Sequence, residues 1–90
     1  KYFNTLVKKM VEALVLINTE VGNESEVVEK LKSFEEVKEI YVVYGIYDIL
    51  ARIKTESIDK LKDIVAGKIR KIPNVKATLT MIVVEQGQKK

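Results

Sequence analysis

The spacing of apolar residues divides this chain into alternating strand-like and helix-like stretches. Residues 11–18 (VEALVLIN) are short, rich in Val, Ile and Leu, and apolar on both faces near their middle. This pattern predicts a strand that is covered on both sides. Residues 24–34 instead place charged residues on one face and apolar residues at helical spacing on the other, which predicts a helix with the apolar face Val27, Val28, Leu31 and Phe34.

Two further strands are expected in the middle of the chain. Residues 37–44 (VKEIYVVY) and 47–54 (YDILARIK) are rich in β-branched and aromatic residues, which favours strands. Only Gly45 and Ile46 lie between them, which predicts a two-residue type II′ hairpin turn. The first central position of that turn needs a positive φ, so the glycine has a structural role there. The two tyrosines that flank the turn would face each other.

The last third of the chain predicts one more helix and one more strand. Ser57 is a typical N-cap residue, and a broad apolar stripe at helical spacing follows it. Pro73 would stop this helix at the residue before it. Residues 75–84 (VKATLTMIVV) then predict a strand. Thr78 and Thr80 lie on one face of that strand, because alternate residues share a face.

The resulting order, β-α-β-β-α-β, predicts an α+β fold of the ferredoxin-like type. In this sandwich one four-stranded antiparallel sheet carries both helices on one face. The other face should be polar if it met water, yet the predicted strands are apolar on both faces. We therefore expect the sheets of two copies to pack face to face in a dimeric α/β barrel.

The pattern places one domain between two short terminal segments. Residues 11–84 form the ferredoxin-like domain, and residues 85–90 (EQGQKK) form a polar tail. Residues 1–10 form an N-terminal leader whose apolar residues have the spacing of a short helix. The leader is equally well read as an extra arm, or as a segment upstream of a natural start at Met10.

Composition narrows the functional classes. The sequence has no histidine and no cysteine, so it lacks the usual general base and the usual nitrogen and thiolate metal ligands. We predict no catalytic residue, no metal site and no cofactor. No apolar run approaches the roughly 18 residues that span a membrane, and the run after the charged start is too short for a signal peptide. A cytoplasmic protein is expected.

The net charge of +3 resides in the terminal segments. Residues 10–88 carry 11 basic and 13 acidic residues. The other five basic residues lie outside this range: Lys1, Lys8, Lys9, Lys89 and Lys90. A nucleic-acid-binding face needs clustered cations. The cluster of Lys68, Arg70 and Lys71 at a predicted helix end also suits the helix dipole. No direct binding of nucleic acid is expected.

Two features of the strands admit a functional interpretation. Asp48 lies in a predicted strand, where aspartate is disfavoured, and it follows the glycine turn. Thr78 and Thr80 place two hydroxyls on one face of an otherwise apolar strand. A structural interpretation stays open as well. Glycine suits a turn, aromatic residues stabilise its flanks, Asp48 is exposed beside it, and threonine is a good strand former.

Together these residues resemble the effector-binding domain of the leucine-responsive/asparagine-regulator (Lrp/AsnC) transcription factors, also called the regulation-of-amino-acid-metabolism (RAM) domain. The resemblance covers residues 11–84. VYGIYDI is similar to the family's glycine-any-aromatic-aspartate hairpin. VLINTEVGNESEVVEKL, KIRKIPNV and TLTMIVV are also typical of the family in this order and spacing.

The resemblance implies a homodimer that pairs through its sheets, and rings of dimers, commonly octamers. It also implies a small-molecule effector, usually an amino acid, at the contacts between dimers. An aspartate would accept from the effector's ammonium, while backbone N–H groups and a threonine hydroxyl would donate to its carboxylate. Of the candidates, Ile46 and Met81 would line a pocket for the effector's side chain. The hairpin and the last strand of a neighbour together supply the candidate ligand-binding residues: Gly45, Ile46, Tyr47, Asp48, Thr78, Thr80 and Met81.

One departure from the family matters. Full-length members carry an N-terminal helix-turn-helix that binds DNA, and the residues before the first predicted strand are too few to hold it. We expect a stand-alone effector domain, or a piece cut from a longer protein, that acts on transcription by assembling with full-length relatives or buffers an amino acid. A structural assembly module without a ligand is one alternative. The other is a small monooxygenase- or isomerase-like enzyme, which a cavity holding Tyr41 or Arg52 beside a second acid would favour.

Overall fold

The computed structural model describes residues 9–87. Along the chain they form β1 (Val11–Thr19), α2 (Glu24–Lys32), β2 (Val37–Val42), β3 (Ile49–Thr55), α3 (Ile58–Ile64), the π-helix η1 (Val65–Ile69) and β4 (Val75–Ile82). Each predicted element is present, with boundaries that differ by a few residues. The predicted leader lies outside the described residues except for Lys9 and Met10.

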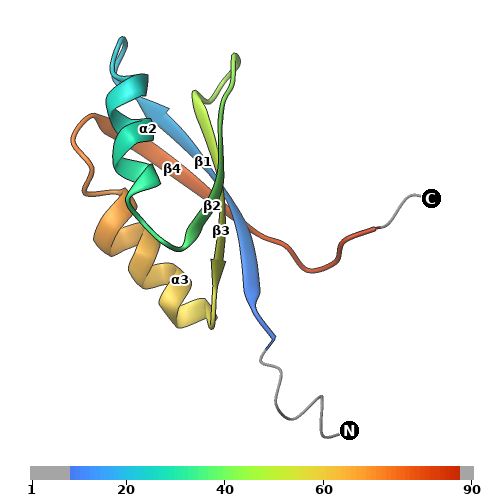
Figure 1. Cartoon of the computed structure of the whole chain (residues 1–90). Coiled ribbons are helices and arrows are strands. Elements are labelled where there is room, and N and C mark those ends of the chain that lie inside the picture. Colours follow the sequence, from blue (N-terminus) through green and yellow to red (C-terminus); the bar gives the residue numbers. More distant parts are fainter. Residues whose placement is uncertain (1–8, 88–90) are drawn as a thin grey trace, which may run out of the picture.

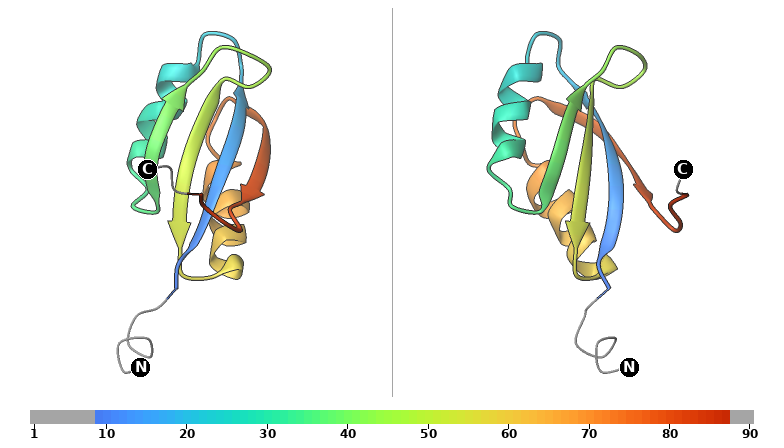
Figure 2. Two further views of the ribbon diagram at one scale, coloured as in Figure 1. Left: turned by 90° about the vertical axis from the view of Figure 1, so that its right-hand side faces the viewer. Right: turned by 45° about the vertical axis from the view of Figure 1, so that its right-hand side comes forward.

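A single antiparallel sheet contains the strands of the described residues in the order β2-β3-β1-β4. Helices α2 and α3 lie on one face of this sheet, and the described residues leave the other face bare (Figure 1; Figure 2). The ferredoxin-like α+β sandwich predicted from the sequence is confirmed.

The core lies between the sheet and the helices. Val27 and Leu31 of α2 and Ile69 of η1 are fully buried against the sheet. Burying an aliphatic side chain of this size contributes about 1.5–3 kcal/mol. Alternate residues of the two central strands face these helices and are also fully buried: Ala13, Val15, Ile17, Ile49, Ala51 and Ile53. Every second residue of each central strand therefore faces the core.

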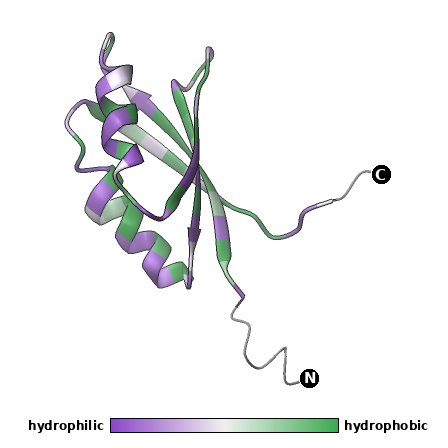
Figure 3. Cartoon of the chain, viewed as in Figure 1, coloured by the Kyte–Doolittle hydropathy of each residue, from purple (hydrophilic) through white to green (hydrophobic). Residues whose placement is uncertain are grey.

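The opposite side of the sheet, which we call the open face, is also rich in apolar residues. Strand register aligns its residues into rows, because residues directly opposite each other in antiparallel strands point to the same side. Figure 3 shows apolar segments along the strands, interrupted by hydrophilic ones. Tyr41, Leu79 and Met81 are 49%, 45% and 42% exposed. One row contains Tyr41, Leu50, Leu16 and Leu79, and the next contains Glu39, Arg52, Leu14 and Met81.

The predicted two-residue turn at Gly45 and Ile46 is wrong. Strand β2 ends at Val42 and β3 begins at Ile49, and these two residues pair in the predicted register. The connection is a six-residue segment, which we call loop 43–48. Gly45 has no positive φ, so it does not adopt the type II′ conformation that the sequence suggested.

The second helix differs from the prediction at its C-terminal end. Ser57 caps α3 as predicted, since its Oγ accepts a hydrogen bond from the Lys60 backbone N–H at 3.1 Å. The helix continues directly into η1, which ends at Ile69, before the Ile72 boundary predicted from Pro73.

Candidate functional site

The four predicted hairpin residues lie together in loop 43–48, at one end of the sheet (Figure 1). Gly45 and Ile46 are exposed, and Tyr47 and Asp48 are half-buried. The prediction that these side chains are neighbours follows from their adjacency in the sequence. Their environment does not, because the strands open out before the predicted turn.

Asp48 is tied to strand β1 by two hydrogen bonds. Its backbone N–H donates to the Ile17 carbonyl at 3.0 Å, and its Oδ2 accepts from the Thr19 backbone N–H at 2.8 Å. Asp48 is half-buried, whereas the structural interpretation had it exposed beside the turn. These bonds hold Asp48 against β1. In the described part of the chain Oδ1 of Asp48 makes no hydrogen bond, so it is open to a ligand.

Exposed apolar side chains gather at this same end of the molecule. Loop 43–48 and the loop between β1 and α2 both lie there (Figure 2). Tyr44 is fully exposed and Ile46 is 88% exposed. Large exposed apolar patches are typical of interaction surfaces. We call it the apical patch, and it consists of Val21, Val42, Val43, Tyr44 and Ile46.

Strand β4 divides the remaining predicted residues between the two faces of the sheet. Thr78 pairs with Ile17 and Thr80 with Val15, and those β1 residues face the helices. Both threonines therefore point to the helix side. Met81 lies on the open face, so within one chain it does not line the same surface as the threonines.

Loop 43–48 and the threonines of β4 lie on opposite sides of strand β1. The loop joins β2 to β3 and is bonded to β1 through Asp48, whereas β4 is the outer strand on the other side of β1. Ile49 and Thr78 belong to one row, with the fully buried Ile17 between them. Two strand spacings, roughly 10 Å, separate their backbones. One chain therefore does not bring the two halves of the predicted site together.

A groove that the sequence analysis missed lies between the second helix and β4. Its volume is about 450 Å³, and its lining is largely apolar, with Ile58, Leu61 and Ile82 among the lining residues. Thr80 also lines it, as does the cationic Arg70. The signal in the sequence was the breadth of the apolar stripe on the second helix, which starts at the 46% exposed Ile58.

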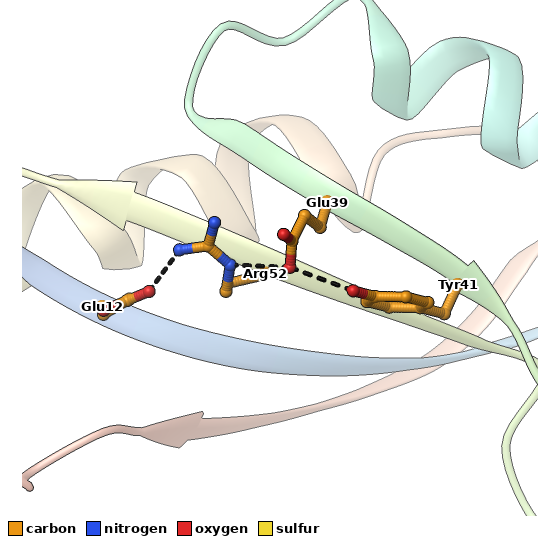
Figure 4. Close-up of polar contacts among 4 residues, drawn as sticks. All are labelled: Glu12, Glu39, Tyr41 and Arg52. Carbon is orange, nitrogen blue, oxygen red and sulfur yellow. Dashed lines mark hydrogen bonds and ion pairs between the residues drawn. The ribbon is translucent and has the colours of Figure 1, made fainter. Parts of the chain in front are cut away.

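A polar cluster crosses three strands on the open face (Figure 4). Arg52 on β3 donates from Nε to Oε1 of Glu39 on β2 at 2.9 Å, and from Nη1 to Oε2 of Glu12 on β1. The Tyr41 hydroxyl donates to the same oxygen of Glu39 at 3.1 Å. We call these four residues the Arg52 cluster. The sequence analysis missed it because its members meet only once the strand register is known.

The Arg52 cluster holds its charges fixed near neutral pH. The hydrogen bond from Arg52, with a second from Tyr41, lowers the pKa of Glu39 below its usual value. The bond to Glu39 raises the pKa of Tyr41 and, together with the bond to Glu12, that of Arg52. All three shifts lead away from neutrality, so they favour an electrostatic role over proton transfer.

Residues 9–87 contain no helix long and apolar enough to cross a bilayer. No three acidic, histidine or cysteine side chains within these residues gather closely enough to hold a metal ion.

Sequence comparison relates the chain to a known protein family. A family model described as the Lrp/AsnC ligand binding domain matches residues 12–89. HTH-type transcriptional regulator FL11 of Pyrococcus abyssi is 36% identical over 73 residues, which are 81% of this chain and 48% of FL11. Regulatory protein AsnC of Haemophilus influenzae is 39% identical over 57 residues, which are 63% of this chain and 38% of AsnC. The chain spans about half or less of the length of these curated relatives.

Solved structures agree with the sequence match. The crystal structure of FFRP-DM1 is 44% identical with a TM-score of 0.80, and the match covers 82% of this chain and 99% of that one. The structure of Escherichia coli AsnC is 26% identical with a TM-score of 0.85, covering 97% of this chain and 58% of that one. The family match and the fold extend over the same β-α-β-β-α-β body. The chain therefore belongs to the Lrp/AsnC family, as a ligand-binding domain related to those of its transcription regulators.

Proposed function

We propose that this domain binds a small molecule, an amino acid, at contacts between copies of the chain, and that binding changes its assembly. One observation carries the proposal: the two halves of the predicted site, loop 43–48 and the pair Thr78 and Thr80, lie on opposite sides of β1 in one chain. A pocket that uses both halves needs two copies of the chain. The regulatory role is supported by the names of the curated relatives, which are transcription regulators.

Two surfaces support the proposed assembly. The open face is apolar and bare of described residues, so two sheets would pair there into a homodimer. The apical patch of one dimer would cover the groove beside β4 of the next, since exposed Tyr44 and Ile46 offer apolar side chains to an apolar lining. Repetition of this contact would give a ring of dimers, such as an octamer.

The proposed pocket suits the two charged ends of an amino acid. Oδ1 of Asp48 would accept from the ammonium group, because Oδ2 is occupied by Thr19. Backbone N–H groups of loop 43–48 and a hydroxyl of Thr78 or Thr80 would donate to the carboxylate. Gly45, Ile46 and Tyr47 would complete the loop side of the pocket. We assign Met81 to the surface where sheets pair, because it lies on the open face.

The domain would influence transcription through its assembly. We propose that it co-assembles in the cytoplasm with full-length Lrp/AsnC relatives, which would contact the DNA, and that it does not bind DNA itself. An effector would favour one assembly over another by no more than its differential affinity for the two. The size of the regulatory effect is therefore set by contacts that the effector makes in only one assembly.

The structure brings Tyr41 and Arg52 together with acids on the surface of the sheet, whereas the enzyme alternative called for a cavity that holds them. They lie on the open face, and their pKa shifts lead away from neutral pH. A general acid or base works best with a pKa near the operating pH. We therefore prefer a binding function to an enzymatic one.

Calorimetric titration of the domain with each of the twenty amino acids, with light scattering of the same samples, tests the proposal. We expect a small number of amino acids to bind and to change the mass or the melting temperature. Asp48→Asn is the informative variant, because its amide oxygen can still accept from Thr19 while the charge is lost. It should keep the fold and bind the effector at least about tenfold more weakly. A domain that responds to none of the amino acids would instead be a structural assembly module.

A further inference from the structure

The Arg52 cluster lies where the proposed function places a second copy of the chain. Glu39 and Arg52 share a row of the open face with Leu14 and Met81. The side chains of Arg52, Glu12 and Glu39 are 29%, 26% and 47% exposed. A partner that covered this face would remove the water that now solvates them. Desolvated charges are costly unless the partner supplies matching groups.

The cluster itself contains groups that could match those of a second copy. Arg52 uses Nε and Nη1, Glu12 uses Oε2, and Glu39 uses Oε1. Among residues 9–87, Nη2 of Arg52, Oε1 of Glu12 and Oε2 of Glu39 have no hydrogen-bond partner. A guanidinium nitrogen only donates and a carboxylate oxygen only accepts. The cluster therefore presents a free donor beside free acceptors (Figure 4).

The charges around the cluster also balance. Lys54 pairs with Glu12 across β1 and β3, so it lies on the open face as well. Arg52 and Lys54 together offset the two carboxylates. Two copies can then meet without a net repulsion between like charges. An interface around a two-fold axis requires such self-complementarity, because the same residues approach it from both sides.

We propose that Glu12, Glu39 and Arg52 determine which chains pair through their sheets, by binding the same cluster of a second copy of this chain. This inference rests on the sheet pairing of the proposed function. The apolar rows attract any apolar sheet and so distinguish little between partners. A partner without the cluster would leave the free donor and acceptors buried and unmatched, and it would be rejected for that reason.

Mixing two kinds of chain tests this selection directly. The wild-type chain is combined with the variant Glu39→Gln/Arg52→Met, which removes one acid and one base and leaves Glu12 and Lys54 to balance each other. One of the two chains carries heavy isotopes, and native mass spectrometry counts the pairs after subunit exchange. Random pairing of equal amounts would make about half of all pairs mixed. We expect mixed pairs to be at least about fivefold fewer than that. In larger assemblies, the distribution of compositions is compared with the binomial one.

The matched control removes an ion pair from the other side of the molecule. Glu29 and Lys32 on α2 form an exposed pair at 3.1 Å, and the variant Glu29→Gln/Lys32→Met should mix with the wild type at random. Circular dichroism checks that each variant is folded. If the double variant of the cluster does not fold, the single variant Glu39→Gln takes its place, because that side chain is half exposed.

The outcomes separate this inference from the function on which it rests. Random mixing of the wild type with a folded cluster variant overturns the role in selection and leaves the sheet pairing intact. A wild-type chain that stays monomeric on its own overturns both. The inference is supported if the cluster variant forms few mixed pairs with the wild type while the control variant forms mixed pairs at random.

Discussion

Asp48 and Thr19 lie 29 positions apart and are joined by a 2.8 Å hydrogen bond from the Thr19 backbone N–H to Oδ2 of Asp48. The bond fixes loop 43–48 to the end of β1. The residue that we propose for the effector's ammonium therefore also holds its own part of the site in place. If the whole side chain is removed, binding could be lost because the ammonium loses its partner or because the loop is no longer held. Different variants of Asp48 are therefore needed to separate the two roles.

Asp48→Ala should lower the free energy of unfolding by about 1–3 kcal/mol, because the buried Thr19 N–H loses its acceptor. Asp48→Asn should lower it by less than about 1 kcal/mol, because an acceptor oxygen remains. Urea unfolding followed by circular dichroism measures both values. Equal losses in the two variants would contradict the structural role of this hydrogen bond.

Gly45→Ala should leave the free energy of unfolding unchanged or raise it by up to about 1 kcal/mol, since alanine restricts the unfolded chain. Gly45 has no positive φ, and a Cβ there would meet nothing within 4 Å. Gly22 is the matched control, because its φ is +85° and its Cβ would also meet nothing within 4 Å. Gly22→Ala should cost about 1–2 kcal/mol. A comparable loss of stability in Gly45→Ala would indicate that Gly45 needs a positive φ, as in the tight turn that the sequence suggested.

Leu79→Lys should dissociate the proposed sheet pairing. Leu79 lies in an apolar row of the open face and is 45% exposed. A buried, unpaired ammonium there should weaken pairing at least about 100-fold. Light scattering over a dilution series measures the shift. Val84→Lys is the control, because Val84 is 94% exposed beyond the end of β4 and the substitution should leave the mass unchanged. Equal masses for wild type and Leu79→Lys would contradict the pairing.

Stability should depend on Glu39 in a defined pH range. Its pKa is lowered in the folded state, first by the hydrogen bond from Arg52. The carboxylate therefore stabilises the fold above its unfolded pKa, and this contribution disappears as the pH falls through the folded pKa. The difference in unfolding free energy between wild type and Glu39→Gln should be full at neutral pH and shrink as the pH falls below the ordinary glutamate pKa of about 4.3. A constant difference across that range would contradict the charge-assisted bond.

Most of the fold could be predicted because each element left a local signal. Runs of β-branched and aromatic residues identified the strands, and Ser57 marked the start of α3. The turn failed for a non-local reason. Gly45 and Ile46 have a suitable local sequence, but the bonds of Asp48 to β1 govern the path of loop 43–48. Hydrogen bonds between distant strands leave no trace in a window of neighbouring residues.

The candidate site was less accessible to prediction. Residues adjacent in the sequence, such as Tyr47 and Asp48, were expected together and are found together. Thr80 and Arg70 share a groove only because a helix packs beside the outer strand. The Arg52 cluster depends on the register of three strands. The face that a strand residue occupies follows from its odd or even position along the strand. Its partner on the neighbouring strand depends on the register, which the sequence does not show.

The placement of the loop and the groove on opposite margins gives the proposed contact between dimers a polarity. Each copy contributes its loop to one contact and its groove to a different contact. A contact between two copies therefore leaves one loop and one groove free to bind further copies. The number of subunits is then set by the angle between successive dimers, and a head-to-tail chain whose angle does not close continues as a fibre. A substitution that only tilts loop 43–48 would thus act on the size of the particle before it acted on affinity.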